Sequence, residues 1–300
     1  MKFLEENQIK ITVLTPSYNR AHTLPRLYES LLRQNNNRFK WLIVDDGSTD
    51  NSKYVIENFD NSKFQIDYVY KKNGGKHTAI NFGMQYIDSE YTFIVDSDDY
   101  LNNDAIELVE KWIGDIENLK NFAGVAGIRT YSNNVNDIIG DYPRNINYID
   151  CLNSERKKNH LLGDKAEIYK TKLLKEYPFP EYENEKFIPE SVIWNKFALM
   201  GLKVRWHKES LIICEYLNDG LTAAVNNLSF FEKNLKGYLE DCRINLKVLK
   251  FPFNYLAAST FYAKCRAIKR SNCLNDLHLT IAEKIIVKLL GFIRYKIGRY

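Results

Sequence analysis

The sequence predicts an α/β protein with a doubly wound, mostly parallel sheet, followed by a helical and basic C-terminal region. Two observations predict this fold class. Over the first half of the chain, short apolar runs alternate with segments of helical periodicity, and strands separated by helices need the crossover connections of parallel sheets. From residue 228 onward the strand signals fade and helical periodicity dominates. We therefore place a boundary near residue 226, between a domain of residues 1–226 and a region of residues 227–300.

The predicted elements follow one another in a regular order. A strand over residues 9–14 ends at Thr15-Pro16, and apolar residues at helical spacing follow over residues 24–32, with Thr23 as the N-cap. The later predicted elements are strands over 41–44 and 66–70, a helix over 76–87, a strand over 91–95, a helix over 103–117, a strand over 122–128, loops with short elements over 130–165, and strands over 203–206 and 211–216.

The composition is that of an ordinary globular protein. Of 300 residues, 45% are hydrophobic and 27% are charged, and a chain of this length can bury a sizeable core without disulfides. The five cysteines are scattered without a CxxC pair, which favours buried free thiols in a reducing compartment. The N-terminus has no apolar run typical of a signal peptide, and no stretch of about 18 apolar residues occurs. We therefore expect a cytoplasmic protein without a transmembrane helix.

Charge is unevenly distributed along the chain. Residues 228–300 contain 14 Lys and Arg against 5 Asp and Glu, a net charge of +9, which leaves −5 for the remainder of a chain whose total is +4. This suits an anionic partner for the C-terminal region. Apolar residues at 281, 285, 289, 292 and 293 lie at helical spacing beside four basic residues, and this pattern suits a helix on an anionic membrane. The alternative is a helix packed on the body of the protein or on another subunit.

An acidic cluster, Asp96-Ser97-Asp98-Asp99, directly follows the predicted strand over 91–95. Three carboxylates within four residues are electrostatically unfavourable unless a cation lies among them. Such oxygen ligands suit Mg²⁺ or Mn²⁺, which are held by one or two carboxylates together with substrate phosphates. The alternative is a solvated acidic turn that caps the next helix. A calcium EF-hand is excluded, because the sixth position counted from Asp96 is Leu101 rather than glycine.

Two further polar clusters follow predicted strands. The first, Asp45 to Asp50, offers a carboxylate to the ring N–H of a uracil, and Gly47 lets the backbone approach a flat base; alternatively, Ser48 or Asp50 caps the following helix. The second, Asn73 to His77, opens a helix where N–H groups and a lysine can contact a phosphate; alternatively, it is a simple turn. The GxxxxGK[ST] and GxGxxG motifs are absent, which excludes a P-loop and a dinucleotide site.

These clusters are expected to meet at one edge of the sheet, because ligands bind beyond the carboxyl ends of parallel strands. The motifs, in chain order, are Thr15-Pro16-Ser17-Tyr18-Asn19-Arg20, Val44-Asp45-Asp46-Gly47-Ser48-Thr49-Asp50, Gly74-Gly75-Lys76, Asn81-Phe82-Gly83 and Asp96-Ser97-Asp98-Asp99. This order resembles that of family 2 glycosyltransferases with the GT-A fold, over residues 9–220. Segments 163–167, 187–190 and 215–222 are similar to those of bacterial members that build surface polysaccharides.

The resemblance implies roles for individual residues. Pro16 and Tyr18 would lie against the nucleobase, and Asp46, with Asp45, would bond its ring. Asp96 would contact the ribose or the base. Asp98 would coordinate the metal, with Asp99 nearby. The full set implied for nucleotide-sugar binding is Pro16, Tyr18, Arg20, Asp45, Asp46, Gly75, Lys76, Asn81, Asp96 and Ser97.

The acceptor side departs from the family pattern at one position. Many members carry a Glu-Asp pair there, and the matching residues in this chain are Glu190-Ser191. This assigns the catalytic base to Glu190 and places Asp164 on the acceptor side. The other candidates for the base are Asp164, Glu183 and Glu185. The family inverts the anomeric configuration by direct displacement, so one base suffices.

The predicted function is transfer of a sugar from a nucleotide-sugar to a saccharide or lipid-linked acceptor in surface polysaccharide synthesis. UDP is the expected nucleotide, and Mn²⁺ or Mg²⁺ is the expected cofactor. We expect no nucleic acid partner. We do expect peripheral contact with the inner face of the cell membrane. A haloacid-dehalogenase-like phosphatase is the runner-up, although Asp99 and Tyr100 replace the small residues that usually follow its Asp-x-Asp. A nucleotidyltransferase would carry glycines after the first strand, where residues 15–20 have none. The alternative from another class is a non-catalytic membrane-associated scaffold.

Overall fold

The computed structural model describes residues 9–215, 224–225 and 227–298. The chain divides into two compact units. The first consists of Met1–Pro178 and Gly201–Glu215, and the second of Phe179–Met200 and Tyr216–Tyr300. The boundary predicted near residue 226 falls outside the described residues and stays a prediction, as does the extent of the two predicted regions.

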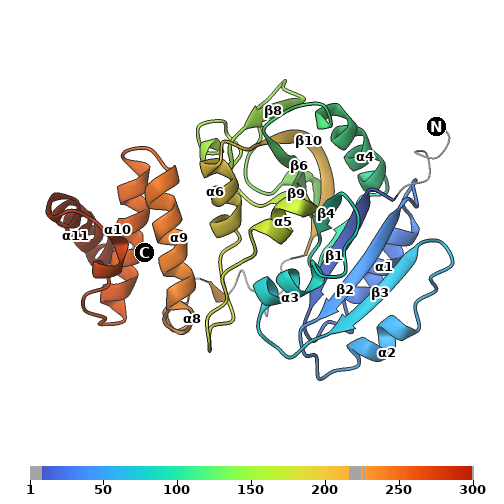
Figure 1. Cartoon of the computed structure of the whole chain (residues 1–300), viewed down its shortest axis with the longest axis horizontal. Coiled ribbons are helices and arrows are strands. Elements are labelled where there is room, and N and C mark those ends of the chain that lie inside the picture. The colour runs from blue at the N-terminus through green and yellow to red at the C-terminus, as the bar shows by residue number, and fades with distance from the viewer. Residues whose placement is uncertain (1–8, 216–223, 226, 299–300) are drawn as a thin grey trace. The chain divides into compact units, whose positions relative to one another are not determined.

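The first unit is built on a large sheet with the strand order β3-β2-β1-β4-β9-β6-β10-β5. Its N-terminal part is parallel and alternates with helices, which confirms the predicted crossover connections (Figure 1). The elements of this part are β1 (Ile11–Ser17), α1 (Leu24–Leu32), β2 (Phe39–Asp45), α2 (Ser52–Glu57), β3 (Gln65–Tyr70), α3 (Lys76–Gly83) and β4 (Tyr91–Ile94).

The rest of the sheet is mixed. β9 is antiparallel to both β4 and β6, whereas β10 is parallel to β6. The α/β class is therefore confirmed, with parallel pairs concentrated in the N-terminal part. The remaining elements of this unit are β5 (Tyr100–Leu101), α4 (Ala105–Ile116), β6 (Phe122–Tyr131), β7 (Asn134–Ile138), β8 (Tyr148–Cys151), the 3₁₀ helix η1 (Asn153–Glu155), β9 (Lys165–Lys170), α5 (Thr171–Glu176) and β10 (Lys203–Cys214).

Two sequence predictions about strands were wrong in their limits. The strands predicted at 203–206 and 211–216 are one strand, β10, whose register with β6 shifts between Trp206 and Ile212. β1 does not end at Thr15-Pro16 but continues to Ser17. Its pairing with β4 stops at Leu14, while its pairing with β2 runs on to Ser17. Pro16 has the parity of Leu14, whose carbonyl faces β4, so its missing N–H lies beyond the end of β4 and breaks no ladder bond.

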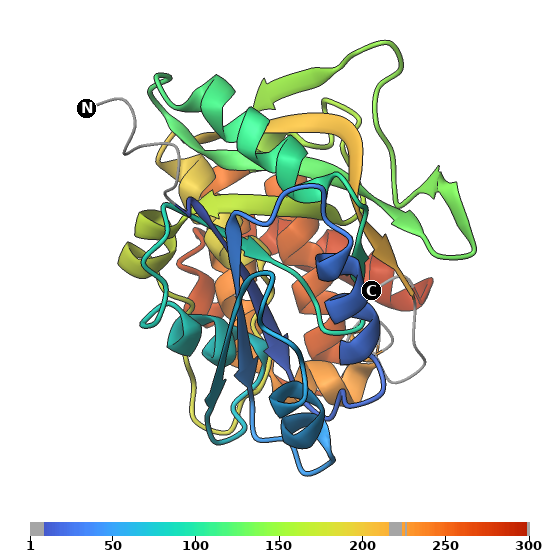
Figure 2. The same cartoon turned by 90° about the vertical axis from the view of Figure 1, so that its right-hand side faces the viewer.

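Helices cover both faces of the parallel strands (Figure 2). Val13 and Ile43 belong to a buried cluster with the leucines of α1 and the apolar residues of α4. Leu14 and Val44, the next residues along each strand, lie instead against Gly83 of α3. Successive strand residues point to opposite faces, so this alternation is the physical basis of the doubly wound arrangement.

The second unit is helical. Its described elements are α6 (Ser191–Leu199), α8 (Leu228–Lys233), α9 (Leu235–Val248), α10 (Phe253–Ala267), η2 (Asn275–Leu277) and α11 (Ile281–Lys296). Their core includes Phe231, Leu235, Phe261 and Val287. All five cysteines of the chain are buried and free, as the sequence predicts. Among the residues that the structure describes, no helix is both long and apolar enough to cross a membrane.

Gly124 and Gly114 form a matched pair for testing how tightly the sheet is packed. A Cβ added at Gly124 in β6 would overlap the carbonyl group of Ile168 in β9, whereas one added at Gly114 in α4 would meet nothing within 4 Å. We expect Gly124→Ala to lower the free energy of unfolding by roughly 1–3 kcal/mol. Gly114→Ala should raise it by about 0.5–1 kcal/mol, because alanine favours a helix interior. Urea titration measures both, and equal effects would contradict this packing.

Candidate active site

The loops that follow β1 and β2 are joined by hydrogen bonds at the carboxyl edge of the sheet. The amide of Asn19 donates to Ser48 Oγ over 2.8 Å, and the amide of Thr49 donates to Asn19 Oδ1 over 2.8 Å. The amide of Ala21 donates to Asp50 Oδ2 over 3.0 Å. The predicted meeting of residues 15–20 and 45–50 at one edge is therefore confirmed. Tyr18, on the loop after β1, is 46% exposed.

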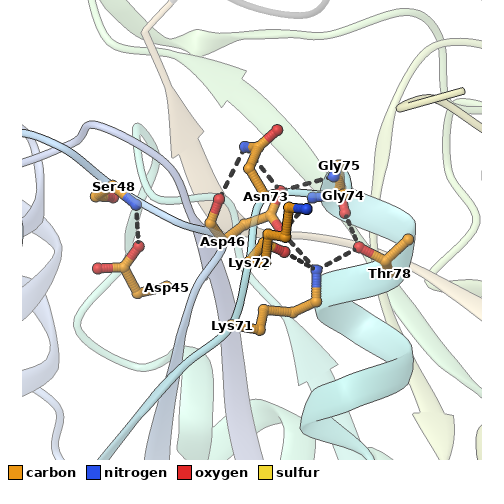
Figure 3. A network of polar contacts seen from close by, with 9 residues as sticks. All are labelled: Asp45, Asp46, Ser48, Lys71, Lys72, Asn73, Gly74, Gly75 and Thr78. Atoms are coloured by element: carbon orange, nitrogen blue, oxygen red, sulfur yellow. Dashed lines mark hydrogen bonds and ion pairs between the residues drawn. The ribbon is translucent and has the colours of Figure 1, made fainter. Parts of the chain in front are cut away.

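Asp46 is the centre of a hydrogen-bond network with the loop that leads into α3 (Figure 3). Its Oδ1 accepts from Lys71 Nζ over 2.7 Å and from the amide of Gly74 over 2.9 Å. Its Oδ2 accepts from the amide of Gly75 over 2.7 Å and from Asn73 Nδ2 over 3.2 Å. The residue is only 3% exposed. Asp46 thus orders the loop over residues 71–75, and its expected bond to a nucleobase stays a prediction.

Asp45 and Gly47 stabilise the turn that follows β2. Asp45 Oδ1 accepts from the amide of Ser48 over 2.7 Å, and its Oδ2 accepts from the Tyr68 hydroxyl over 2.9 Å. Gly47 has a φ of +84°, and a Cβ there would lie 2.7 Å from the amide nitrogen of Asn73. Glycine is required here because the loop over 71–75 packs directly on the turn. The sequence predicts that a nucleobase approaches the backbone at Gly47. In this structure the loop over residues 71–75 makes that close approach.

The N-cap residue of α2 is Asn51, whose side chain makes no capping bond, so neither Ser48 nor Asp50 is the N-cap that the alternative named. Asp50 Oδ1 accepts from the amide and the hydroxyl of Ser52, the first residue of α2. Ser48 instead bonds the loop after β1. One acidic residue of the motif therefore bonds the first residue of a helix while the other two order the surrounding loops.

The cluster after β4 is balanced by two basic side chains. Asp96 forms an ion pair with Lys76 and lies 3.5 Å from Arg129 Nη1. Asp99 Oδ2 accepts from the same Arg129 nitrogen over 2.8 Å. The guanidinium is held in place because its Nε donates to the carbonyl of Lys165 over 3.0 Å. Sequence reasoning missed Arg129; the available signal was a cation directly after the apolar strand predicted over residues 122–128, which the structure extends to Tyr131.

The two paired carboxylates titrate in opposite directions. Burial alone would raise the pKa of Asp96, but the charges of Lys76 and Arg129 outweigh it and lower that pKa. Burial raises the pKa of Asp99, and the neighbouring charges of Asp96 and Asp98 raise it further, against the attraction of Arg129. The difference follows largely from the ion pair of Lys76 with Asp96. Asp96 therefore carries the firmer negative charge of the two.

Asp98 is the one carboxylate of this cluster that is not paired with Lys76 or Arg129. No other described residue donates a hydrogen bond to its side chain, and burial, with the charge of Asp96, raises its pKa. Its backbone is fixed instead: the carbonyl of Asp98 accepts from Arg26 Nη2, and the other end of that guanidinium pairs with Glu215. The Arg26 group also lies 4.8 Å from the ring centroid of Tyr100. The charges of Arg20 and Lys76 act on Asp98, but neither side chain is hydrogen-bonded to it, so a cation would find one positioned carboxylate.

The donor set suits a divalent ion that arrives with a diphosphate. Within the described part of the chain, no three His, Cys, Asp or Glu side chains are placed to hold a metal by themselves. Mg²⁺ and Mn²⁺ are commonly held by one or two carboxylates together with substrate phosphates. Asp98 fits this role. Asp99 would first have to leave Arg129, so its role as a second ligand stays a prediction.

The other expected nucleotide-sugar residues lie around the same edge. Gly75, with a φ of +96°, precedes α3, and Asn81 lies on that helix. The amide of Arg20 donates to Ser52 Oγ over 3.1 Å. Pro16, near the end of β1, and Ser97, in the loop after β4, are both buried.

The candidates for the base lie in both units. Asp164 is exposed just before β9 in the first unit. In the second unit, Glu190 is the N-cap residue of α6. Glu185 accepts from the amides of Lys236 and Gly237 over 2.9 and 3.0 Å, which commits its carboxylate to the start of α9. Of the candidates that sequence reasoning named, Glu185 is thus the least available for proton transfer.

A doubly wound sheet with polar loops gathered at its carboxyl edge is the architecture of α/β proteins that bind ligands at that edge. Comparison with known proteins identifies the family: the model of glycosyl transferase family 2 matches residues 12–178. The chain belongs to the family 2 glycosyltransferases, which confirms the predicted family and sets aside the phosphatase alternative.

Relatives and solved structures agree with this assignment. The chain is 26% identical to the glycosyltransferase GlyA of Streptococcus pneumoniae over 267 residues, which cover 79% of this chain but only 38% of GlyA. It is 35% identical to a chondroitin synthase of Pasteurella multocida over 101 residues, 34% of this chain and 10% of that protein. The chain thus spans well under half the length of these relatives.

The fold is shared with two solved structures. TarS of S. aureus, solved with UDP-GlcNAc, superposes with a TM-score of 0.62 at 20% identity, over 95% of this chain and 81% of that one. The mannosyltransferase PcManGT of Pyrobaculum calidifontis, solved with GDP-Man and Mn²⁺, superposes with a TM-score of 0.55 at 14% identity, over 98% of this chain and 88% of that one. The predicted GT-A-like fold is confirmed.

The Asp46 network gives a local prediction. Asp46→Asn keeps the size of the side chain but removes the charge and one acceptor that hold Lys71 and the amides of Gly74 and Gly75. We expect a loss of about 1–3 kcal/mol in the free energy of unfolding and faster hydrogen exchange at Gly74 and Gly75. The control is Asp60→Asn, since Asp60 is exposed and bonds only Ser62 by its side chain. Unchanged exchange at the two glycines would contradict an ordering role for Asp46.

Proposed function

We propose that this protein transfers a sugar from a UDP-sugar to a hydroxyl of a saccharide or lipid-linked acceptor in surface polysaccharide synthesis. The observation that carries the proposal is the available carboxylate of Asp98, positioned by Arg26 beside the paired Asp96 and Asp99. The family supports sugar transfer. The solved complex of TarS with UDP-GlcNAc supports UDP as the nucleotide, and similarity to GlyA and a chondroitin synthase supports a saccharide product.

We propose that Asp98 holds Mn²⁺ or Mg²⁺ together with the diphosphate of the donor. When bound, the ion would neutralise charge that develops on the departing diphosphate. The protein supplies two further cations, Lys76 and Arg129, both of which contact Asp96. Because Lys76 lies in the first turn of α3, its ammonium and the helix N-terminus favour an anion at the same place. The exposed ring of Tyr18 would stack on the base.

A charge-neutral substitution tests the metal role. Asp98→Asn removes one negative charge and the metal ligand, while the backbone contact to Arg26 is unaffected. We expect the Mn²⁺-dependent part of UDP affinity to fall at least about tenfold, as for the loss of an interaction of about 1.4 kcal/mol, with no change in the urea midpoint. Calorimetry with and without Mn²⁺ measures the effect. Asp104→Asn, on the exposed N-cap residue of α4, is the matched control, and an Asp98→Asn variant that keeps its Mn²⁺ dependence would refute the assignment.

We propose Glu190 as the general base of an inverting displacement. The acceptor oxygen would form a bond to the anomeric carbon as the bond from that carbon to the diphosphate oxygen breaks, and the hydroxyl proton would pass to the Glu190 carboxylate. Glu190 lies at the start of α6, where its carbonyl accepts from the amides of Ile193 and Trp194. The next residue, Ser191, donates to Asp241 Oδ1 over 2.5 Å and anchors this turn to α9. The backbone that carries the base is thus fixed.

Glu190→Gln separates catalysis from binding. The amide keeps the size and most polar contacts of the side chain but cannot take up the proton. Turnover should fall by roughly 10²–10⁴-fold, while UDP and Mn²⁺ affinity stay nearly constant, as measured by donor consumption and calorimetry. Glu232→Gln, on an exposed residue of α8 in the same unit, is the control. Wild-type turnover in the Glu190 variant would transfer the role to Asp164, and loss of donor binding would show that Glu190 serves the donor site.

We also propose that the enzyme acts at the inner face of the cell membrane, where a lipid-linked acceptor would be presented. The support for this part lies in the second unit.

A further inference from the structure

In the part of the chain that the structure describes, one face of helix α11 carries exposed apolar side chains. Val287 and Gly291 are buried, and an added Cβ at Gly291 would meet Tyr262 and the carbonyl of Ser259 in α10. One face of α11 therefore packs on α10. With 3.6 residues per turn, the opposite face collects the exposed apolar residues. These form the α11 face: Ile281 (81% exposed), Ile285 (54%), Leu289 (63%), Phe292 (45%), Ile293 (57%) and Ile297 (57%).

Exposed aromatic residues extend this surface at one end. Phe251 and Phe253, at the start of α10, are 75% and 43% exposed. The Tyr255 hydroxyl donates to Glu283 Oε1 over 2.8 Å, which brings the start of α10 beside the first turn of α11. That turn carries Ile281, the most exposed residue of the α11 face. Large apolar side chains in such a concentration usually mark an interaction surface.

The charges around the α11 face are positive. Lys284 and Lys288 lie on the same helix, and Arg294 and Lys296 lie in its last turn. Glu283 is the one acidic residue of α11, and its carboxylate is engaged by Thr280 and Tyr255. Residues 228–300 carry a net charge of +9. The surface is thus both apolar and basic.

We infer that the α11 face docks on a lipid surface that contains anionic headgroups. An amphipathic helix of this kind lies in the plane of the interface, with its apolar side chains in the acyl boundary and its lysines among the headgroups. A symmetric contact between two copies fits less well, because it would bring the lysines of both α11 helices together with no free acid on the helix to offset them. The inference deepens the proposed function, since a lipid-linked acceptor is found at the same surface, but docking does not depend on sugar transfer.

Sedimentation of the full chain with vesicles tests this. The probes are vesicles of phosphatidylcholine alone and of phosphatidylcholine mixed with phosphatidylglycerol. We expect binding to the mixed vesicles only, and weaker binding in high salt, because salt screens the lysines. The double variant Ile285→Ser/Leu289→Ser changes two exposed residues and should lower the partition coefficient at least about tenfold. Lys284→Gln/Lys288→Gln should lower it and remove most of the salt dependence. The control, Tyr54→Ser/Val135→Ser, removes equally exposed apolar residues of the first unit and should bind normally.

Several outcomes would overturn the inference. These are no binding to mixed vesicles, equal binding to neutral vesicles, or equal binding by the Ile285→Ser/Leu289→Ser variant and its control. A dimer that dissociates in this variant, without vesicle binding, would assign the α11 face to self-association. Mn²⁺-dependent UDP affinity is measured on the same samples. If it is normal while vesicle binding is absent, docking fails but the proposed donor site stands; the reverse result refutes the donor site alone.

Discussion

The buried guanidinium of Arg129 is the contact on which the acidic edge of the sheet depends. Two carboxylates, Asp96 and Asp99, lie against it, and burying either without a cation would cost several kcal/mol. β6 can place a charged side chain there because Arg129 also donates to the carbonyl of Lys165 in β9. With Asp96 and Asp99 paired in this way, Asp98 is the carboxylate of the cluster that remains for an external cation.

The aspartates at and just after the ends of the strands β2 and β4 therefore have different structural roles. Asp45 and Asp46 hold the turn after β2 and the loop over residues 71–75, and Asp50 holds the start of α2. The ordered loop carries Lys76 to Asp96, so the network around Asp46 and the one around Arg129 meet. A substitution at Asp46 should thus also disturb the ion pair of Lys76 with Asp96, through the loop.

The segment over residues 179–200 contains the proposed base, Glu190, and packs with the C-terminal helices. It lies between β9 and β10 in the sequence but belongs to the second compact unit. Buried polar contacts hold it there: Ser191 bonds Asp241, and Asn195 Nδ2 donates to Asn245 Oδ1 over 2.8 Å. The same unit carries the α11 face. The proposed base, Glu190, and the proposed docking surface therefore belong to the same unit.

Local pattern in the sequence determined the family, the alternation of strands and helices, and the edge where the motifs meet. These depend on periodicity and on turn residues close together in the chain, as in the leucines of α1 and the loop after β4. Only the tertiary structure decided which carboxylates are paired with a basic side chain or a backbone amide. Arg129, Lys71 and Arg26 reach their partners from 25 to 72 positions away in the chain, and no local pattern encodes such pairings. The continuation of β1 through Pro16 was likewise decided by where β4 stops, because a missing N–H is costly only opposite a paired strand.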